Sequence, residues 1–273
     1  MSATNSNTHT VSVAELGDIP VTVVDQGAGR PFLLLHGGGG PLTVDAFSAQ
    51  LADESAGRRV LVPIHPGFNA TPRPEELGDA PGLARLYVAL LETLDLEDVT
   101  VVGNSIGGWI TAEMAVLGSP RVSGYVILDG VGIDVEDHPI VDFFSLTPAE
   151  VAQHSYYDPD RFGLDPSKLP PAVLETLTAN RATLSVYGAN MADVSLRQRL
   201  ADVSAPVLVA WGEADRIADT DYGRAYAAAI PGAEFLLMER AGHLPQIETP
   251  EALLEVLTAF AARTASGQSG RSA

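Results

Sequence analysis

The sequence predicts an α/β protein whose sheet has eight mostly parallel strands. Short runs of β-forming residues alternate with helical patterns, and most of these runs are apolar throughout. A strand covered on both faces has no polar side, so continuous apolar runs are typical of parallel sheets. The 273 residues are 46% hydrophobic and 19% charged, which excludes a disordered chain.

Eight runs qualify as strands. A short turn at Gly17-Asp18 separates the first two, which favours an antiparallel hairpin, whereas the later runs are spaced widely enough for crossover helices. The predicted strands are Val11–Glu15, Val21–Asp25, Pro31–Leu35, Arg59–Ile64, Val99–Val102, Gly124–Leu128, Pro206–Trp211 and Glu234–Met238. The predicted helices outside the interruption described next are Pro81–Leu94, Ile106–Leu117, Asp221–Ala229 and Pro250–Ala262.

The alternation stops once, over about 70 residues between Gly132 and Val203. Two short amphipathic helices are predicted there, at Pro148–His154 and Pro171–Leu184, joined by a turn-rich stretch. An insertion of this length is too long for a plain loop. We therefore expect residues 132–203 to form a helical cap over the carboxyl edge of the sheet, where open α/β sheets bind ligands, and 11–131 with 204–263 to form the core.

The two ends of the chain, 1–10 and 264–273, are polar and predicted to be disordered. The head has neither the charged nor the apolar region of a signal peptide, and no apolar run approaches the ~20 residues that span a bilayer. We expect a cytoplasmic protein without a membrane partner. The sequence leaves its oligomeric state open between a monomer and a homodimer.

Charge and cysteine content exclude several functions. Sixteen Lys and Arg against 35 Asp and Glu give a net charge of −19, which disfavours nucleic acid and anionic membranes as partners. The absence of cysteine excludes disulfides, thiolate metal sites and a cysteine nucleophile. A small-molecule substrate is the partner that we expect.

A nucleophilic serine is predicted at Ser105. The segment Gly103-Asn-Ser105-Ile-Gly107 places Gly-x-Ser-x-Gly between a predicted strand and a predicted helix, which is the setting of a nucleophile elbow. A serine raised on so sharp a turn needs very small neighbours, and Gly103 and Gly107 provide them. The positive end of the following helix would stabilise an adjacent oxyanion.

A glycine run, His36-Gly-Gly-Gly-Gly40, follows the strand Pro31–Leu35 and can turn its N–H groups toward the site. We expect the amides of Gly38 and Ile106 to form an oxyanion hole. The alternatives are a flexible loop and a phosphate cradle, and the run lacks the Lys-Ser/Thr of a P-loop. His36 is interpreted as a structural turn residue.

The base is predicted at His243, in a Gly-His loop between the last strand and the last helix. The acid that orients it is predicted at Asp215, in the loop that follows the strand Pro206–Trp211. Asp129, at the end of the strand Gly124–Leu128, is the competing candidate for this acid.

The order Ser105, Asp215, His243, together with the elbow, the His-Gly run and the Gly-His loop, resembles the α/β-hydrolase fold family. The resemblance runs from about Val11 to Ala262 and implies an eight-stranded, mostly parallel sheet with helices on both faces and a cap inserted after the sixth strand. It implies acyl chemistry through an acyl-enzyme, without a metal or an organic cofactor.

The chain departs from the family pattern in the run that follows its fourth predicted strand. An Asp-x-Pro-Gly-x-Gly run that is common in the family reads Ile64-His65-Pro66-Gly67-Phe68-Asn69 here, so a hydrogen bond near the site is expected to be rearranged. The candidate pocket residues are Gly39, His65, Trp109, Phe143, Phe144 and Leu244. His65 is alternatively a packed structural residue, and the phenylalanines are alternatively cap packing.

Three functions remain open. The main prediction is a serine hydrolase, of the carboxylesterase kind, that cleaves a small-molecule ester, thioester or lactone. The first alternative is a carbon–carbon bond hydrolase acting on a ring-cleavage product, because Gly103-Asn-Ser-Ile-Gly-Gly resembles that subgroup's elbow, although the glycine run continues Gly40-Pro41-Leu42 instead of Pro-Gly-Ala. The second alternative is a small-molecule receptor that keeps the triad without efficient turnover.

Overall fold

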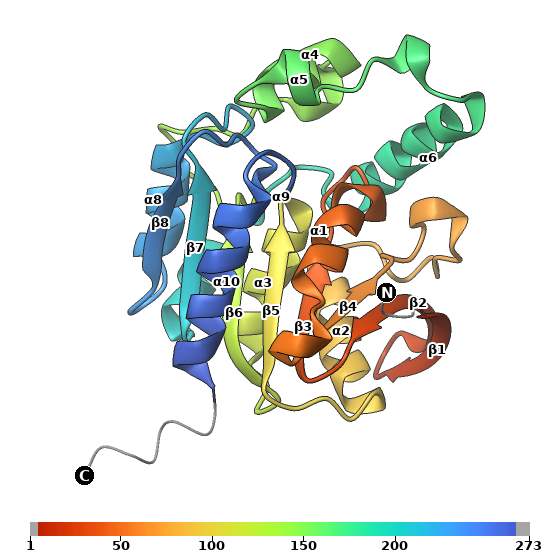
Figure 1. The fold of residues 1–273 in the computed structure, drawn as a ribbon, viewed down its shortest axis with the longest axis vertical. Helices are drawn as coiled ribbons and strands as arrows, with labels where there is room; N and C mark the ends of the chain where they lie inside the picture. The colour runs from red at the N-terminus through yellow and green to blue at the C-terminus, as the bar shows by residue number, and fades with distance from the viewer. Residues whose placement is uncertain (1–4, 266–273) are drawn as a thin grey trace.

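The computed structural model describes residues 5–265, which form an eight-stranded sheet with the strand order β1-β2-β4-β3-β5-β6-β7-β8 (Figure 1). The strands from β4 to β8 are mutually parallel, whereas β2 is antiparallel to both β1 and β4. Their bounds are β1 Asn5–Val13, β2 Gly17–Gly27, β3 Arg30–Leu35, β4 Arg58–Pro63, β5 Val99–Asn104, β6 Val122–Leu128, β7 Val207–Gly212 and β8 Glu234–Met238. This is the predicted fold class.

The head of the chain was expected to be disordered as far as residue 10, and this is wrong for residues 5–10. Asn5 pairs with Asp25, and the antiparallel register continues to Val13 opposite Gly17. The first half of β1 is mostly exposed, so its stability comes from backbone hydrogen bonds and not from apolar burial. A polar sequence is therefore compatible with this edge strand. Residues 1–4 lie outside the described residues.

Helices cover both faces of the sheet. Successive side chains of a strand point to opposite faces, and because both faces are buried, the sequences of the buried strands are apolar at most positions. On one face, α2 (Ala80–Thr93), α3 (Ile106–Leu117) and α8 (Thr220–Ala228) pack with Leu33 and Leu35. On the other, α1 (Asp45–Leu51) and α10 (Pro250–Thr264) pack with Phe32 and Leu34. Figure 1 shows α1 and α10 in front of the sheet and α3 behind it. Each strand therefore buries both of its sides.

The last helix also bounds the predicted tail. Because α10 continues through Thr264, the expected tail begins at least one residue later than position 264. Residues 266–273 lie outside the described residues.

The segment between β6 and β7 is helical and lies above the carboxyl ends of the strands (Figure 1). It contains α4 (Pro148–Ser155), α5 (Pro159–Phe162), α6 (Pro171–Tyr187) and α7 (Leu196–Arg199). Helix α6 is fixed to the core by side chains on one of its faces, since the Tyr187 hydroxyl donates to the Pro66 carbonyl at 2.8 Å and the Thr183 hydroxyl donates to the Gly67 carbonyl at 3.0 Å. We call residues 132–203 the cap.

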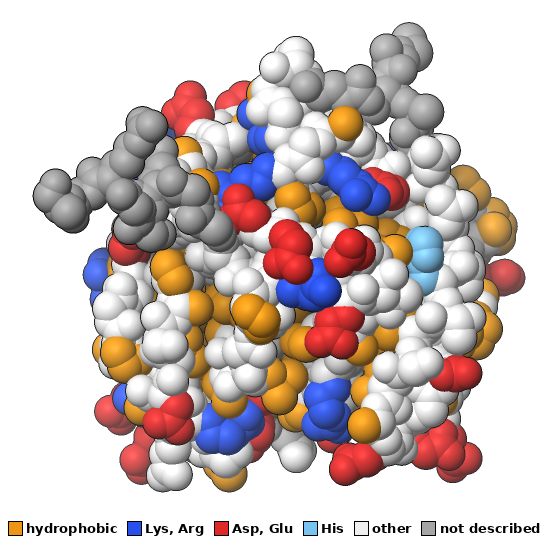
Figure 2. All heavy atoms as spheres, turned by 90° about the horizontal axis from the view of Figure 1, so that it is seen from below, with side chains coloured by type: hydrophobic (Ala, Val, Ile, Leu, Met, Phe, Trp, Pro, Cys, Tyr) orange, Lys and Arg blue, Asp and Glu red, His pale blue; other side chains and the backbone are white. Residues whose placement is uncertain are grey.

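The opposite edge of the sheet carries mixed charge. Figure 2 views this face and shows basic and acidic side chains interspersed among apolar ones. Arg121, which precedes β6, pairs with Asp95 and Glu97 in the turn before β5. Within residues 5–265, none of the helices combines the length and apolar character needed to cross a bilayer.

Candidate active site

Ser105 stands on a strained turn between β5 and α3. Its φ of 57° and ψ of −119° lie outside the regions that side-chain-bearing residues ordinarily adopt. Gly103 and Gly107 allow the turn, because a Cβ on Gly103 would lie 2.0 Å from the Gly107 carbonyl oxygen and one on Gly107 would lie 2.3 Å from the Leu35 carbonyl oxygen. The sequence therefore folds here into the elbow geometry that raises a serine at a sheet edge.

His243 and Asp215 form a buried hydrogen-bonded pair. Nδ1 of His243 lies 2.8 Å from Oδ2 of Asp215, and both side chains are almost completely buried. The other carboxylate oxygen of Asp215 accepts from the N–H groups of Ile217 at 2.8 Å and Ala218 at 3.3 Å. With Nδ1 donating to the carboxylate, Nε2 of the neutral ring is left as the acceptor, which is the role of a general base. Asp215 and not Asp129 makes this contact.

The His243 loop is held between the elbow and the cap. The backbone N–H of His243 donates to the Ser155 carbonyl at 2.7 Å. Its carbonyl accepts from Nδ2 of Asn104 at 2.9 Å, and Oδ1 of Asn104 accepts from Gln246 in α9 (Pro245–Glu248) at 3.1 Å. Sequence reasoning missed this role of Asn104, although its position directly before the nucleophile was a usable signal.

The expected oxyanion donors are available. Ile106 is the first residue of α3, so its amide has no partner within the helix. Among the described residues, neither the Ile106 amide nor the Gly38 amide has a hydrogen-bond acceptor. Gly38 lines the same cavity as Ser105 and His243. We expect these two unpartnered amides, one next to the serine in the chain and one in the cavity that it lines, to bind the oxygen of a tetrahedral intermediate.

The glycine loop also docks on the cap. Asn180 of α6 is buried, its Oδ1 accepts from the Asn69 amide at 2.8 Å, and its Nδ2 donates to Oδ1 of Asn69 at 3.1 Å. A Cβ on Gly40, whose φ is +85°, would lie 2.5 Å from Nδ2 of Asn180. Gly40, which extends the glycine run, and Asn69, which stands where the family run has its second glycine, therefore both contact Asn180 of the cap.

His36 and His65 support the glycine loop from inside the core. Nδ1 of His36 donates to the Gly37 carbonyl at 2.8 Å, and its Nε2 accepts from the His65 amide at 3.2 Å. Nε2 of His65 donates to the His36 carbonyl at 2.9 Å, and its Nδ1 accepts from the Tyr87 hydroxyl. Every ring nitrogen is used by a neutral tautomer, so both rings are structural.

This histidine pair predicts loss of stability in acid. Burial lowers the pKa of His36 to about 4, and burial followed by repulsion from His36 lowers that of His65 well below its usual value. Below pH ~6.5 these histidines bind protons in the unfolded chain but stay neutral in the folded one. As the pH decreases, the free energy of unfolding therefore falls by up to about 1.4 kcal/mol per pH unit for each ring. Urea unfolding between pH 7 and 4 measures this slope.

His65→Gln is the matched variant for this prediction, because it removes one titrating group while retaining donor and acceptor atoms. Its stability curve is expected to be flatter than that of the parent between pH 6.5 and 4. Parallel curves for the two proteins would show that His65 is not buried in its neutral form.

A cavity of about 300 Å³ lies between the elbow and the cap. Ser105, His243 and Asn104 line its floor, and cap leucines such as Leu174 and Leu177 line its walls. Three of the predicted pocket residues, Gly39, Phe143 and Leu244, are part of this lining.

The other three predicted pocket residues do not line this cavity, and those predictions are wrong. His65 is enclosed in the core by His36 and Tyr87, as described above. Trp109 lies on the far side of α3, where its ring packs under Gly132 and its Nε1 donates to Glu113. Phe144 lines a neighbouring cavity of about 270 Å³ that includes Phe143 and Met191 as shared lining.

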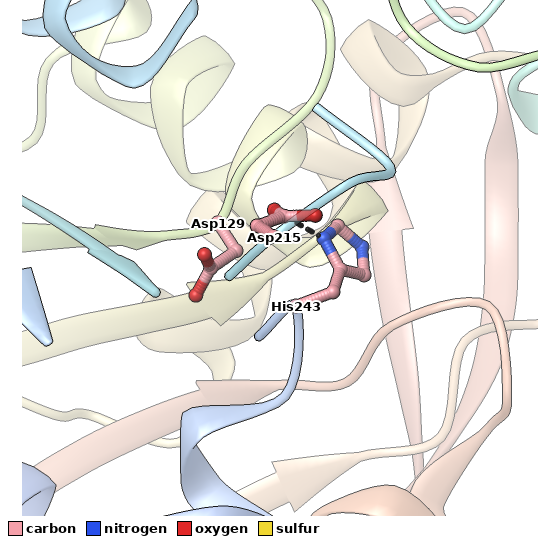
Figure 3. A group of neighbouring side chains, drawn as sticks. All are labelled: Asp129, Asp215 and His243. Carbon is pink, nitrogen blue, oxygen red and sulfur yellow. Dashed lines mark hydrogen bonds and ion pairs between the residues drawn. The ribbon is translucent and has the colours of Figure 1, made fainter. Parts of the chain in front are cut away.

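Asp129, Asp215 and His243 each place one oxygen or nitrogen atom within 4.8 Å of the others (Figure 3). Oxygen and nitrogen donors of this kind can bind a divalent metal ion. However, Nδ1 of His243 and Oδ2 of Asp215 already form a hydrogen bond of 2.8 Å with each other. The geometry fits a catalytic pair better than a metal centre.

Comparison with known proteins assigns the family. Residues 32–256 match the model of the alpha/beta hydrolase family. This chain belongs to the alpha/beta hydrolase family. A 2-hydroxy-6-oxononadienedioate/2-hydroxy-6-oxononatrienedioate hydrolase of Paraburkholderia phymatum is 30% identical, with 94% of the alpha/beta hydrolase described here and 99% of the relative covered.

Two further proteins resemble this alpha/beta hydrolase over nearly their whole length. A 2-hydroxy-6-oxo-6-phenylhexa-2,4-dienoate hydrolase of Burkholderia cepacia is 27% identical, over 95% of this chain and 97% of the relative. The structure of a thermophilic esterase from Thermogutta terrifontis superposes with a TM-score of 0.70 at 23% identity, covering 95% of this chain and 100% of the esterase. The chain is thus a hydrolase by family, and its bond specificity is taken up next.

Proposed function

We propose that this hydrolase cleaves a carbon–carbon bond in a 2-hydroxy-6-oxo-dienoate, the first of the two alternatives to ester hydrolysis raised by the sequence. The named relatives act on such dienoates and match nearly the whole chain. The sequence departure that counted against this function lies at Gly40-Pro41-Leu42, and Leu42 is exposed and absent from the cavity lining. The departure therefore does not alter the reacting end of the site.

The charge of the cavity is the observation that carries the proposal. Among the described residues that line it, Arg181 is the single cation, and there is no carboxylate. In a chain of net charge −19, a cavity without acidic residues favours an anionic substrate. Dienoates carry a carboxylate, whereas a simple ester has no group that needs a cation.

Backbone carbonyls hold the Arg181 side chain in place, and its positive charge is not neutralised by a carboxylate of the described residues. Its Nη2 donates to the carbonyls of Phe143 at 2.8 Å and Leu146 at 3.0 Å, and the guanidinium lies 4.8 Å from the centre of the Phe143 ring. Within residues 5–265 no carboxylate forms an ion pair with it. A guanidinium fixed by carbonyls retains its full charge and further N–H donors for a carboxylate.

The triad and the cation together suit this reaction. Transfer of the 2-hydroxyl proton to C5 gives a 2-oxo form, and Oγ of Ser105 then adds to the C6 carbonyl while His243 accepts its proton. The C5–C6 bond breaks, its electron pair is delocalised into the 2-oxo group as a dienolate, and His243 returns the proton. Water then releases the acyl group as a carboxylic acid, so the reaction consumes one water and yields an acid and a 2-hydroxydienoate.

Arg181→Gln provides a selective test of the proposal. A charged hydrogen bond to a substrate carboxylate is worth roughly 1.5–3 kcal/mol, so kcat/KM for a dienoate is expected to fall by about 10- to 100-fold. Hydrolysis of p-nitrophenyl acetate, which carries no carboxylate, is expected to change by less than about threefold. Steady-state kinetics with both substrates measures the difference.

Arg181→Lys is the matched control, because it keeps the charge and loses the fork of donors. Its kcat/KM for the dienoate is expected to lie between those of the parent and of Arg181→Gln. Equal losses toward dienoate and ester in the Gln variant would mean that Arg181 supports the cap and does not bind a carboxylate.

A further inference from the structure

Asp129 is a buried carboxyl group to which the triad chemistry gives no role. It follows directly on β6, its φ is +46°, and its side chain is fully enclosed. Oδ1 accepts from the Gly212 amide at 2.7 Å. Oδ2 is buried and has no hydrogen-bond partner among the described residues. Leaving a carboxylate oxygen buried without a donor is costly, so this atom requires an explanation.

The neighbour of Asp129 is the acid of the triad. Figure 3 shows Asp215 between Asp129 and His243, and the three groups approach one another within 4.8 Å. The ionised form of Asp215 is stabilised by protein donors. One of its oxygens accepts from two backbone N–H groups, and the other accepts from Nδ1 of His243. The negative charge of the pair is therefore located on Asp215.

Other charged groups around Asp129 do not compensate a second negative charge. Glu248 of α9 is held by the amides of Gly242, Tyr157 and Asp158, and it is a further carboxylate. No ion pair in the described part of the chain includes Asp129. Burial, then the charge of Asp215, raises the pKa of Asp129 well above its usual range, and Glu248 adds to this, while the Gly212 amide opposes it.

We propose that Asp129 is a positioning residue that remains protonated and donates its Oδ2–H to the Asp215 carboxylate, so that Asp215 stays ionised and correctly oriented toward His243. The proton provides the donor that Oδ2 otherwise lacks. It also removes the repulsion that two adjacent buried carboxylates would exert on each other. This role concerns the triad alone and holds for any substrate.

The role has a consequence for the pH dependence of the enzyme. A donor on Asp215 withdraws some of the negative charge that faces His243, and this makes the imidazolium form less favourable. Loss of the donor would therefore move the acid limb of the activity profile upward. A residue that only fills space would leave the limb in place.

The test compares Asp129→Asn with Asp129→Leu through the rate at which a fluorophosphonate labels Ser105, measured from pH 5 to 9. Labelling reports the reactivity of Ser105 with His243 and does not depend on the natural substrate. Asn is neutral, similar in shape and able to donate to Asp215, so its profile is expected to match that of the parent. Leu has a similar volume but no donor, so its acid limb is expected to move up by about one unit, with a slower plateau rate.

Two results would overturn the proposal. A downward shift of the acid limb in Asp129→Asn would mean that Asp129 is ionised in the parent, because the substitution would then remove a negative charge near His243. An unshifted limb in Asp129→Leu would reduce Asp129 to a packing residue.

Infrared difference spectra provide a second measurement that does not require the Leu variant to fold. The parent minus Asp129→Asn spectrum at pH 7 is expected to contain the C=O band of a protonated, buried carboxyl group. A difference spectrum that contains only carboxylate bands would contradict the proposal. Failure of dienoate turnover would affect neither measurement, so the two proposals can fail separately.

Discussion

Ser105→Ala is expected to lower kcat by several powers of ten, roughly 10³- to 10⁶-fold, while substrate binding is retained. The variant removes Oγ, the atom that forms the acyl-enzyme, but leaves the Asp215–His243 pair and the two unpartnered amides in place. The hydroxyl is small and belongs to the floor of a cavity whose other lining is unchanged, so the affinity for the dienoate is expected to stay within about threefold. Stopped-flow absorbance of the bound dienoate measures both quantities.

Ser145→Ala is the control for this experiment, because Ser145 is an exposed cap serine whose hydroxyl, among residues 5–265, donates only to the Asp142 carbonyl of the same turn. It is expected to retain full activity and full fluorophosphonate labelling, whereas Ser105→Ala is expected to lose both. An active Ser105→Ala enzyme would remove Ser105 from the mechanism.

Gly107→Ala is expected to produce the largest loss of stability, about 3 kcal/mol, and to abolish activity as well. The new Cβ would lie 2.3 Å from the Leu35 carbonyl oxygen and 2.8 Å from that of His36. Both are backbone atoms at the end of a central strand, so they cannot move aside, and α3 must shift and take Ser105 with it. Alanine's better helix propensity, worth up to about 1 kcal/mol, does not offset this clash.

Thermal unfolding measures this loss, which corresponds to roughly 10 °C for a chain of this size. Gly78→Ala is the control, because a Cβ there meets no atom within 4 Å and the backbone is not left-handed. It is expected to change stability by less than about 0.5 kcal/mol. Similar losses in the two variants would contradict the close packing of α3 against β3.

The sequence predicted the sheet well because its strands are buried on both faces. Leu33 and Phe32 point to opposite clusters of core residues, so the run that contains them has no polar position, and the prediction needed no knowledge of the partner helices. The start of β1 was missed because an exposed edge strand requires only backbone pairing, which leaves no apolar signal. The short α1 was missed for a related reason, since seven residues offer few periodic positions.

The site residues likewise include some that the sequence could predict and some that it could not. Ser105, Asp215 and His243 were found because each lies in a local pattern next to a predicted strand end. The pocket was only half predicted, because which side chains line a cavity depends on how the cap sits over the sheet. Trp109 is close to the nucleophile in sequence but is buried in the core against Gly132, whereas Arg181 is distant in sequence and lines the cavity. The state of Asp129 depends on burial and on one neighbour, and neither is visible in the sequence.

The most direct measurement is the turnover of 2-hydroxy-6-oxo-6-phenylhexa-2,4-dienoate by the purified parent protein, with product identification, alongside a series of p-nitrophenyl esters. Carbon–carbon hydrolysis predicts benzoate and 2-hydroxypenta-2,4-dienoate in equal amounts, with kcat/KM for the dienoate well above that for every ester. Rapid turnover of the esters with no cleavage of this dienoate or of its methyl and carboxyethyl analogues would contradict the proposed function and return the protein to ester hydrolysis.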